Sequence, residues 1–502
     1  MPADVLMFQG TASHVGKSVM TAAFCRLLRR RGLRVAPFKA MNMSNNAWVT
    51  PDGGEMAMAQ AVQARAAGVE PVVEMNPVLL KTTSDRASQV IVLGKPIGTY
   101  EARELPALRG RLLQAIHASL QRMRESYDVV VAEGAGSPAE INLRDTDLAN
   151  MEVARASGAE VILVADIERG GVFAQIVGTL ELLEEADRAL VKGFLINKFR
   201  GDPSLVESGV RWLEQRTGKP VFGVVPYLPD LDLPEEDALA DRLRAEEPAS
   251  GADWKIRVQI IRTPAIANFT DFDPLHRELD LSIHYLSEGT QELDLPHLLI
   301  LPGSKSTVSD LQWIRSAGLE PHIRRCVESG VRILGVCGGF QMLGKTILDP
   351  SRVESSAAAT EGLGLLPTST LFLPSKITVQ VRGIHEESGQ AITGYEIHCG
   401  RLQGARRGKP FFRITERGGK PAQETDGFQS EDGRIFGTYL HGLFESDGFR
   451  SFFLNQLRKE AGFPERLTPA GAAAPADRWA DHVAKAVDVE RLLERWAWTP
   501  SA

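Results

Sequence analysis

A glycine-rich loop close to the N-terminus constrains the fold more than any other stretch of the chain. Residues 10–18 read Gly-Thr-Ala-Ser-His-Val-Gly-Lys-Ser, one residue longer than the common GxxxxGK[ST] spacing of phosphate-binding loops. A short apolar run at 5–8 precedes the loop, and a helix-forming stretch at 19–31 follows it. A loop between a strand and a helix presents backbone N–H groups to phosphate oxygens. The stretch therefore predicts a nucleotide site in a parallel α/β domain.

Five positions of this loop are candidates for contact with a nucleotide. In such loops the glycines let the backbone approach the phosphates, the lysine reaches the terminal phosphates, and the hydroxyl of the last residue binds Mg²⁺. We therefore expect ATP to be bound by Gly10, Thr11, Gly16, Lys17 and Ser18, with Ser18 also serving as a Mg²⁺ ligand.

Acidic residues elsewhere in the first half are candidates for the same metal ion. Residues 128–133 form a buried-strand pattern that ends at Glu133. Ligands lie beyond the carboxyl ends of parallel strands, so Glu133 is expected to point at the phosphates and to bind Mg²⁺. Asp52 and Glu55, in a polar and turn-rich stretch at 41–55, are further candidate ligands. Many acidic loop residues are only solvated, and this alternative applies to both.

A second motif surrounds Cys337. Residues 333–336 form a short, mostly apolar run, and Cys337 is followed by two glycines and a helix-compatible run. A strand, a sharp turn and a helix in this order are typical of a nucleophile elbow, whose small neighbours avoid clashes around a strained residue. A helix N-terminus also favours the thiolate. We expect Cys337 to be a nucleophile, and the alternative is a buried structural cysteine.

Backbone N–H groups near this elbow are expected to stabilise an oxyanion formed on an attacked amide. Gly338 and Gln341 follow the cysteine, and Gly303 follows a predicted strand at 298–301. The turn at Gly303 either completes the oxyanion hole or is only a tight turn. We assign Gly303, Gly338 and Gln341 as candidate residues for oxyanion stabilisation and substrate binding.

A nucleophilic thiolate needs a histidine as its proton acceptor. His441 ends a predicted strand at 434–440 and precedes Gly442, a position that would hold a base rigidly. His398 is the competitor and is expected to be a polar or domain-contact residue. We therefore pair His441 with Cys337.

Composition excludes several classes of protein. The 502 residues carry a net charge of −7, which argues against a nucleic-acid binder that relies on phosphate neutralisation. The four cysteines are widely spaced and form no CxxC pair, which favours a reducing cytosol and gives no zinc-site spacing. No apolar run reaches membrane-spanning length, and the N-terminus lacks a signal-peptide pattern. We expect a cytoplasmic protein with neither a membrane nor a nucleic-acid partner.

Alternating strand and helix patterns predict an α/β protein with two domains. Residues 1–230 are expected to hold a mostly parallel sheet around the phosphate loop. An acidic, proline-containing stretch at 231–253 is interpreted as the linker. A second α/β pattern at 254–450 contains the elbow, and residues 451–502 are expected to form a helical tail that docks on the body of the protein.

The lengthened phosphate loop resembles the dethiobiotin synthetase-like branch of P-loop proteins, whose members activate carboxylates with ATP. This resemblance implies that Lys39, at the end of the second predicted strand, also faces the phosphates; the alternative is a solvated strand-end lysine.

The motifs Gly-Val-Cys-Gly-Gly-Phe-Gln around Cys337 and Tyr-Leu-His-Gly around His441 resemble a class I glutamine amidotransferase domain, which implies a flavodoxin-like fold. Common members carry a glutamate two residues after the histidine, where this chain has Leu443. This departure matches the cobyrinate-type branch, which works with a Cys–His pair. It leaves open what orients His441.

From end to end the chain resembles the cobyric acid synthase family. The resemblance implies a glutamine-hydrolysing amidoligase of cobalamin biosynthesis that uses ATP and Mg²⁺. It would amidate the b, d, e and g carboxylates of a corrinoid, adenosylcobyrinic acid a,c-diamide, to give adenosylcobyric acid. Ammonia from the Cys–His site would attack an acyl phosphate. A small departure is Met41, where the family more often has glutamine. The supporting stretches are 38–46, 75–81, 133–143, 268–273, 302–307 and 394–398.

Two other functions compete with this one. Cobyrinic acid a,c-diamide synthase has the same domains and chemistry but acts earlier on the corrin ring. The Met-Ser-Asn-Asn stretch at 43–46 and the Ser-Pro-Ala-Glu-Ile-Asn stretch at 137–142 favour the later enzyme. A ParA-like ATPase with a degenerate amidotransferase module is the second alternative, and the intact Cys337 and His441 argue against it.

Overall fold

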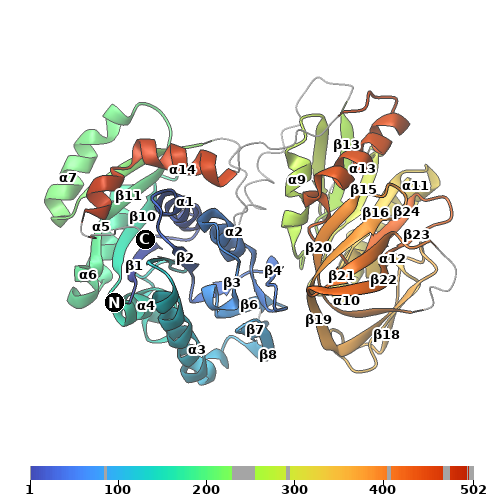
Figure 1. Cartoon of the computed structure of the whole chain (residues 1–502), viewed down its shortest axis with the longest axis horizontal. Coiled ribbons are helices and arrows are strands. Elements are labelled where there is room, and N and C mark those ends of the chain that lie inside the picture. Colours follow the sequence, from blue (N-terminus) through green and yellow to red (C-terminus); the bar gives the residue numbers. More distant parts are fainter. Residues whose placement is uncertain are drawn as a thin grey trace.

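The computed structural model describes residues 2–83, 87–228, 255–289, 294–403, 409–466, 475–494 and 496. Two α/β domains lie side by side (Figure 1). The N-terminal domain comprises the described residues up to 228, and the C-terminal domain those from 255 to 466. The predicted α/β class is confirmed. The linker predicted at 231–253 lies outside the described residues.

The N-terminal domain is built on a six-stranded parallel sheet in the order β12-β11-β10-β1-β9-β2. Its central strand sends Val5 and Met7 into one buried cluster and Leu6 and Phe8 into another. Because helices cover both faces of a parallel sheet, its strands are continuous apolar runs. The strands are β1 (Asp4–Gly10), β2 (Val35–Phe38), β9 (Val129–Glu133), β10 (Glu160–Asp166), β11 (Val191–Phe199) and β12 (Val221–Pro226).

Helices pack on both faces of this sheet (Figure 1). The cluster on one face includes α1, and the cluster on the other includes α3, α4 and α5. None of the described helices is long and apolar enough to cross a bilayer. The helices are α1 (Lys17–Arg30), α2 (Met58–Ala67), α3 (Leu105–Ser126), α4 (Met151–Ser157), α5 (Val172–Leu182), α6 (Glu185–Leu190) and α7 (Glu207–Thr217).

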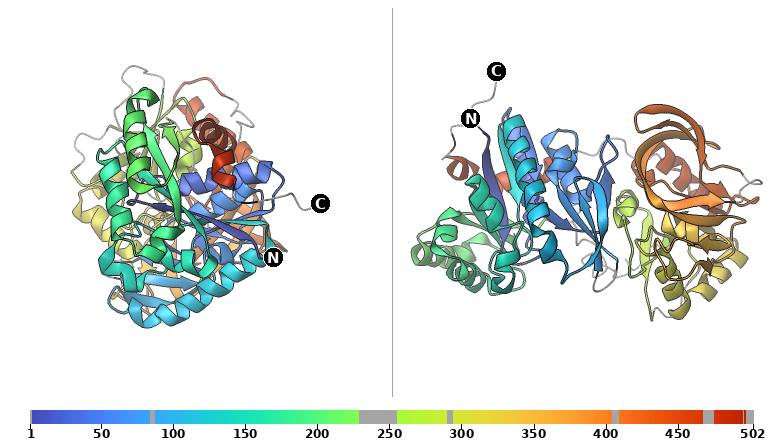
Figure 2. Two further views of the ribbon diagram at one scale, coloured as in Figure 1. Left: turned by 90° about the vertical axis from the view of Figure 1, so that its left-hand side faces the viewer. Right: turned by 90° about the horizontal axis from the view of Figure 1, so that it is seen from below.

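The chain between β2 and β9 also forms two small sheets, on the side of the N-terminal domain that faces the C-terminal domain (Figure 2, right). One has the order β3-β6-β7-β8 and the other pairs β4 with β5. The strand predicted at 89–93 is part of β7, which belongs to this small sheet and not to the main one. The strands are β3 (Met41–Met43), β4 (Ala47–Val49), β5 (Glu55–Ala57), β6 (Val78–Thr82), β7 (Ala87–Val92) and β8 (Lys95–Glu101).

The C-terminal domain contains a second parallel sheet, in the order β14-β13-β15-β16-β24, with β23 antiparallel at its edge. In chain order the five parallel strands read 2-1-3-4-5, which is the flavodoxin-like arrangement predicted for this half. Ligands of such sheets bind beyond the carboxyl ends of the strands. The strands are β13 (Ile256–Ile261), β14 (Leu281–Leu286), β15 (Leu298–Leu301), β16 (Arg332–Val336), β23 (Phe428–Gln429) and β24 (Ile435–Thr438).

A mostly antiparallel sheet adjoins the parallel one and is dominated by the long strands β19 and β20. Its strands are β17 (Thr346–Leu348), β18 (Ala359–Glu361), β19 (Ser369–His385), β20 (Ala391–Gln403), β21 (Phe412–Arg417) and β22 (Lys420–Asp426). The helices of the domain are α9 (Asp273–His276), α10 (Thr307–Ser316), α11 (Glu320–Glu328), α12 (Gly338–Leu343) and α13 (Asp447–Glu460).

The C-terminal segment crosses back to the N-terminal domain. The predicted domain boundary at 450 falls inside α13, whose Phe449, Phe453 and Leu457 belong to the core of the C-terminal domain. The described part of the tail, α14 (Pro475–Ala486) and α15 (Val489–Leu493), packs on the N-terminal domain instead. Helix α14 lies beside α1 (Figure 1), and α15 contacts β12. The described tail is helical, and the domain on which it docks is the one at the other end of the chain.

Candidate functional sites

The phosphate loop joins β1 to α1 and borders a cavity of about 200 Å³. Gly16 has φ 99°, and a Cβ there would run into the side-chain amide of Asn197, so only glycine fits. The Nδ2 of Asn197 donates to the Val15 carbonyl at 3.0 Å and holds the loop against β11. The lining residues are Ser13, His14, Gly16, Lys17, Ser18, Lys39, Asn42, Met43, Glu133, Ala135 and Gly136.

Lys17 and Ser18 begin α1, two residues before the predicted start at 19, and both line this cavity. The Nζ of Lys17 donates to the carbonyl oxygens of Ala12 at 2.9 Å and Gly136 at 3.1 Å. The Oγ of Ser18 donates to a carboxylate oxygen of Glu133 at 2.8 Å. The structure therefore brings together the lysine, the hydroxyl and the carboxylate that the sequence placed in one site.

Lys39 and Glu133 form a buried ion pair, with 2.9 Å between Nζ and Oε1. Gln63, on α2, donates to the other carboxylate oxygen at 2.7 Å. Burial alone would raise the pKa of Glu133, but Lys39 and the hydrogen bonds from Gln63 and Ser18 hold that pKa below its usual value. Glu133 is therefore an anion at neutral pH. Sequence reasoning missed Gln63, because nothing local distinguishes it in a helix rich in Ala and Gln.

The oxygen donors in this cavity fit Mg²⁺. The hydroxyl of Ser18 and the carboxylate of Glu133 are neighbouring hard ligands, and Mg²⁺ takes its remaining ligands from phosphates and water. In the described ranges no three His, Cys, Asp or Glu side chains form a metal cluster.

Asp52 requires a correction. It is exposed in the turn between β4 and β5, where it accepts a hydrogen bond from Thr50 at 2.5 Å, and it is not among the residues that line the cavity.

Gly10 and Thr11 also lie outside that lining. A Cβ at Gly10 would come within 2.9 Å of Nζ of Lys17, and Thr11 donates from its hydroxyl to Gln175 at 3.2 Å. These two residues shape the loop.

Cys337 occupies the predicted sharp turn between β16 and α12. It has φ 48° and ψ −102°, a strained combination for a residue with a side chain. A Cβ at Gly335 would lie 2.7 Å from the backbone nitrogen of Phe340, so the tight packing beneath the turn requires glycine. The Sγ of Cys337 lies 3.7 Å from the carbonyl oxygen of Ile397.

The side chain of His441 contacts both Cys337 and the carboxylate of Asp271. The Nδ1 of His441 is 2.7 Å from Oδ2 of Asp271, and all three side chains are buried. Burial would lower the pKa of His441, but the charge of Asp271, the thiolate of Cys337 and hydrogen bonds to both raise it to about 10. The predicted Cys–His pair is thus brought together, and the residue that orients His441 is Asp271.

The loop that carries Asp271 is tied to both domains. Asn268, with φ 53°, accepts a hydrogen bond at Oδ1 from the backbone N–H of Ala47 in the N-terminal domain at 2.9 Å. The other oxygen of Asp271 accepts the N–H of Gly442 at 2.8 Å. Asp271 lies in the stretch 268–273, which the sequence had marked only as part of a family resemblance. No spacing relates it to a histidine 170 residues away.

The predicted oxyanion residues surround the thiol. A Cβ at Gly303 would lie 3.0 Å from Cε1 of His441, and one at Gly338 would lie 2.8 Å from the backbone nitrogen of Ser304. The two turns are therefore in contact at the nucleophile. Gln341 is buried, and its Oε1 accepts a hydrogen bond from Thr307 at 3.0 Å. Gln341 thus braces α12 against α10 while lining the cavity at Cys337.

His398 also lines this cavity but is engaged by other groups. Its Nδ1 is 2.8 Å from the Gly400 carbonyl, its Nε2 is 3.4 Å from Glu396, and its ring stacks on Tyr439 with 4.0 Å between centroids. These contacts support the polar structural role that the sequence predicted for His398.

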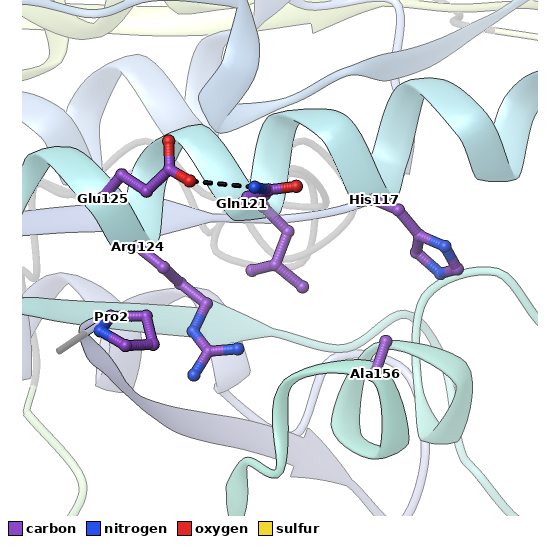
Figure 3. A pocket seen from close by; sticks show the side chains of 7 residues that line it. Pro2, His117, Gln121, Arg124, Glu125 and Ala156 are labelled. Atoms are coloured by element: carbon purple, nitrogen blue, oxygen red, sulfur yellow. Dashed lines mark hydrogen bonds between the residues drawn. The ribbon is translucent and has the colours of Figure 1, made fainter.

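A wider cavity of about 760 Å³ lies away from both sites (Figure 3). It is bounded by α3, the N-terminal segment and the end of α4, and Gln121 donates to Glu125 at 2.8 Å beside it. It contains none of the predicted site residues. Size alone therefore does not identify a functional site here.

Two family models match the two domains. Residues 6–239 match the CobQ/CobB/MinD/ParA nucleotide binding domain, and residues 257–449 match the CobB/CobQ-like glutamine amidotransferase domain. The matched ranges correspond to the sheet that bears the phosphate loop and to the domain that bears Cys337 and His441.

Curated relatives match the chain over its whole length. A cobyric acid synthase from Moorella thermoacetica is 47% identical over 99% of both chains. One from Desulforudis audaxviator is 49% identical over 98% of this chain and 99% of its own. Identity at this level, with both domains and their motifs included, establishes the family. The chain therefore belongs to the cobyric acid synthase family of glutamine-hydrolysing amidoligases.

Proposed function

We propose that this protein uses ATP and glutamine to amidate the b, d, e and g carboxylates of adenosylcobyrinic acid a,c-diamide, giving adenosylcobyric acid. The observation that carries the proposal is the presence, in one chain, of a complete Cys337–His441–Asp271 arrangement and a complete phosphate-loop cavity. One site releases ammonia, and the other activates a carboxylate to receive it.

The glutaminase half follows from the geometry around the thiol. The Sγ of Cys337 attacks the side-chain amide of glutamine, and His441 delivers a proton to the departing ammonia. N–H groups at Gly303 and Gly338 stabilise the negative charge on the amide oxygen. Asp271 holds the imidazole with its Nδ1 turned away from the thiol and stabilises its positive charge. Water then hydrolyses the thioester and regenerates the thiol.

The synthetase half activates a carboxylate, because hydroxide is too poor a leaving group for ammonia to displace. Phosphorylation of the carboxylate by ATP gives an acyl phosphate that ammonia can attack. Lys17 and Lys39 line the phosphate-loop cavity and would neutralise charge on the transferred phosphoryl group. When bound at Ser18 and Glu133, Mg²⁺ would supply further charge neutralisation between the phosphates. Met43, 60% exposed at this cavity, offers an apolar contact for a large substrate.

The decisive experiment is mass spectrometry of adenosylcobyrinic acid a,c-diamide incubated with the protein, ATP, Mg²⁺ and a nitrogen source. We expect four amidations with glutamine, none with Cys337→Ala and glutamine, and recovery by Cys337→Ala with free ammonia. If only cobyrinic acid reacts, and gains two amides, the function is that of the a,c-diamide synthase. ATP hydrolysis without amidation of either compound would support the ATPase alternative.

A further inference from the structure

The cavity beside Cys337 is built by both domains. Its volume is about 90 Å³, far below the roughly 300–1,000 Å³ typical of sites for drug-sized ligands, so it suits a molecule the size of an amino acid. The C-terminal domain contributes Lys305 and Glu354, and the N-terminal domain contributes Lys81 and Gln89 from the paired strands β6 and β7. Charged and amide groups from distant segments thus converge close to the nucleophile.

Two of the three lysines in this cavity are already paired. Glu55 is fully buried, and its two oxygens bind Lys81 at 2.8 Å and Lys376 at 2.5 Å. Among the residues that the structure describes, none forms a hydrogen bond or an ion pair within 4 Å of the ammonium of Lys305. Burial and the neighbouring Lys376 lower the pKa of Lys305, although the charges of Glu354 and Glu55 act in the opposite direction. An anion entering the cavity would therefore meet Lys305 as the available cation.

Glu354 lies on the same cavity as Lys305. Its Oε1 accepts the backbone N–H of Val308 at 3.3 Å. Burial raises its pKa to about 7, although Lys305 and the hydrogen bonds from Thr307 and Val308 act in the opposite direction. A cation beside Glu354 would favour the ionised carboxylate. Glu354 is thus placed to bind a cationic group of a ligand, and the neighbouring Lys305 is placed to bind an anionic group.

Gln89 supplies an independent sign of a ligand. Its Oε1 is buried and has no hydrogen-bond partner within the described parts of the chain. Buried acceptors are normally paired, and each exception calls for an explanation. Gln89 lines the same cavity as Cys337, so a donor bound there would satisfy the orphaned oxygen.

We propose that these three side chains hold the α-amino acid end of glutamine, with Lys305 binding the α-carboxylate and Glu354 and Gln89 binding the α-ammonium. The side-chain amide then points toward Cys337. The inference rests on the glutaminase half of the proposed function and adds its substrate-recognition residues. One of them comes from the N-terminal domain, so the glutamine site is complete only when the two domains are docked.

The test compares glutamine with two truncated amides. Glutaramate lacks the α-ammonium, and 4-aminobutanamide lacks the α-carboxylate. For Lys305→Met we expect KM for glutamine to rise roughly 10- to 100-fold, as for loss of a hydrogen bond to a charged group, with KM for 4-aminobutanamide unchanged. For Glu354→Gln and Gln89→Leu we expect a rise for glutamine and no change for glutaramate. Ammonia release from each amide is measured directly.

Lys305→Arg is the matched control, because it keeps the positive charge, and it should preserve most of the affinity for glutamine. Thermal unfolding and ammonia-driven amidation report whether each variant is folded. An equal rise in KM for glutamine and for the matching truncated amide would overturn the assignment, as would no rise for any of the three variants. Failure of ammonia-driven amidation in the unaltered protein would instead refute the proposed corrinoid reaction, and the glutaminase measurements would still decide this inference.

Discussion

The Nδ1 of His441 lies 2.7 Å from Oδ2 of Asp271, and the second oxygen of the same carboxylate accepts the N–H of Gly442 at 2.8 Å. Asp271 therefore binds both the ring of the histidine and the backbone that follows it. His441 is further held by β20, since its N–H donates to the Tyr395 carbonyl at 2.9 Å. The imidazole has little freedom to turn away from the thiol of Cys337.

Asp271→Asn should disable the glutaminase. The amide would favour the wrong tautomer of His441, so kcat for glutamine hydrolysis should fall by about 10³- to 10⁴-fold. Asp271 raises the pKa of His441, so the alkaline limb of the pH profile should move to lower pH in the variant. Steady-state kinetics from pH 6 to pH 10 would measure both effects. Ammonia-driven amidation should persist, and its loss would indicate a misfolded variant.

Alkylation should distinguish Cys337 from the other cysteines. Burial raises the pKa of Cys326 to about 11 and raises the pKa values of Cys25 and Cys399. Cys337 instead contacts His441 and lines a cavity. Iodoacetamide at pH 7.5 should label Cys337 first, and glutamine should slow the labelling. Peptide mass mapping over time would reveal the order, and equal labelling of Cys399 would contradict it.

Glu133→Gln should impair ATP-dependent amidation and leave the glutaminase active, which is the opposite of the effect expected for Asp271→Asn. The change removes an anionic ligand for Mg²⁺ and leaves Lys39 buried without its counter-charge. Amidation driven by ATP and ammonia should fall roughly 100-fold, while hydrolysis of glutamine alone continues. Asp52→Asn is the matched control, because Asp52 lies outside the cavity and its change should leave amidation intact. The reverse outcome would restore Asp52 as the metal ligand.

Glu55→Gln should destabilise the contact between the domains. The carboxylate of Glu55 is the shared partner of Lys81 and Lys376, and breaking a buried pair by removing one charge costs about 3–5 kcal/mol. Burial would raise the pKa of Glu55, but the two lysines lower it to about 2. A lowered pKa contributes stability that is present above the unfolded value near 4.5 and is lost as pH falls toward 2.

Urea unfolding at pH 7 and at pH 3 would test both statements about Glu55. The difference between the unaltered protein and Glu55→Gln should be large at pH 7 and should shrink at pH 3. A difference that is independent of pH would show that the stabilisation does not come from the charge of Glu55.

Trp479→Phe should weaken the attachment of the tail. The Nε1 of Trp479 donates to the Val19 carbonyl on α1 at 2.6 Å, and the ring is buried beside that helix. Losing the hydrogen bond while keeping most of the packing should cost about 1 kcal/mol of unfolding free energy, against about 3–5 kcal/mol for Trp479→Ala. Urea unfolding of both variants would measure the two losses of unfolding free energy, and equal losses would assign the effect to the hydrogen bond and not to packing.

Local sequence patterns were sufficient to predict the phosphate loop and the sharp turn at Cys337. The nine residues of the phosphate loop and the turn at Cys337 are each contiguous, and their glycines are required by close backbone approach, a constraint that acts within a few residues. The flavodoxin-like order was predicted through family resemblance, and the structure confirms it. His441 was identified because it follows a predicted strand, and in the structure it lies three residues after the end of β24 at Thr438.

Residues whose interaction partners are far away in the sequence could not be identified in the same way. Asp52 and Glu55 belong to one polar stretch, and nothing in the sequence of that stretch distinguishes a solvated carboxylate from a buried one. The structure leaves Asp52 exposed and buries Glu55 between two lysines. Asp271 and Gln63 carry no local signal, since their partners His441 and Glu133 are brought to them only by packing.

The sequence by itself determined the strand–loop–helix units, the sharp turn at Cys337, the phosphate loop and the two-domain order. These depend on backbone conformation and hydrophobic periodicity, which are properties of neighbouring residues. Tertiary structure alone decided which carboxylate orients His441, which acids are buried, where the tail docks, and that Lys81 and Gln89 of one domain complete a cavity in the other. Electrostatic pairing and burial act through space, so they become visible only when segments far apart in the chain are packed together.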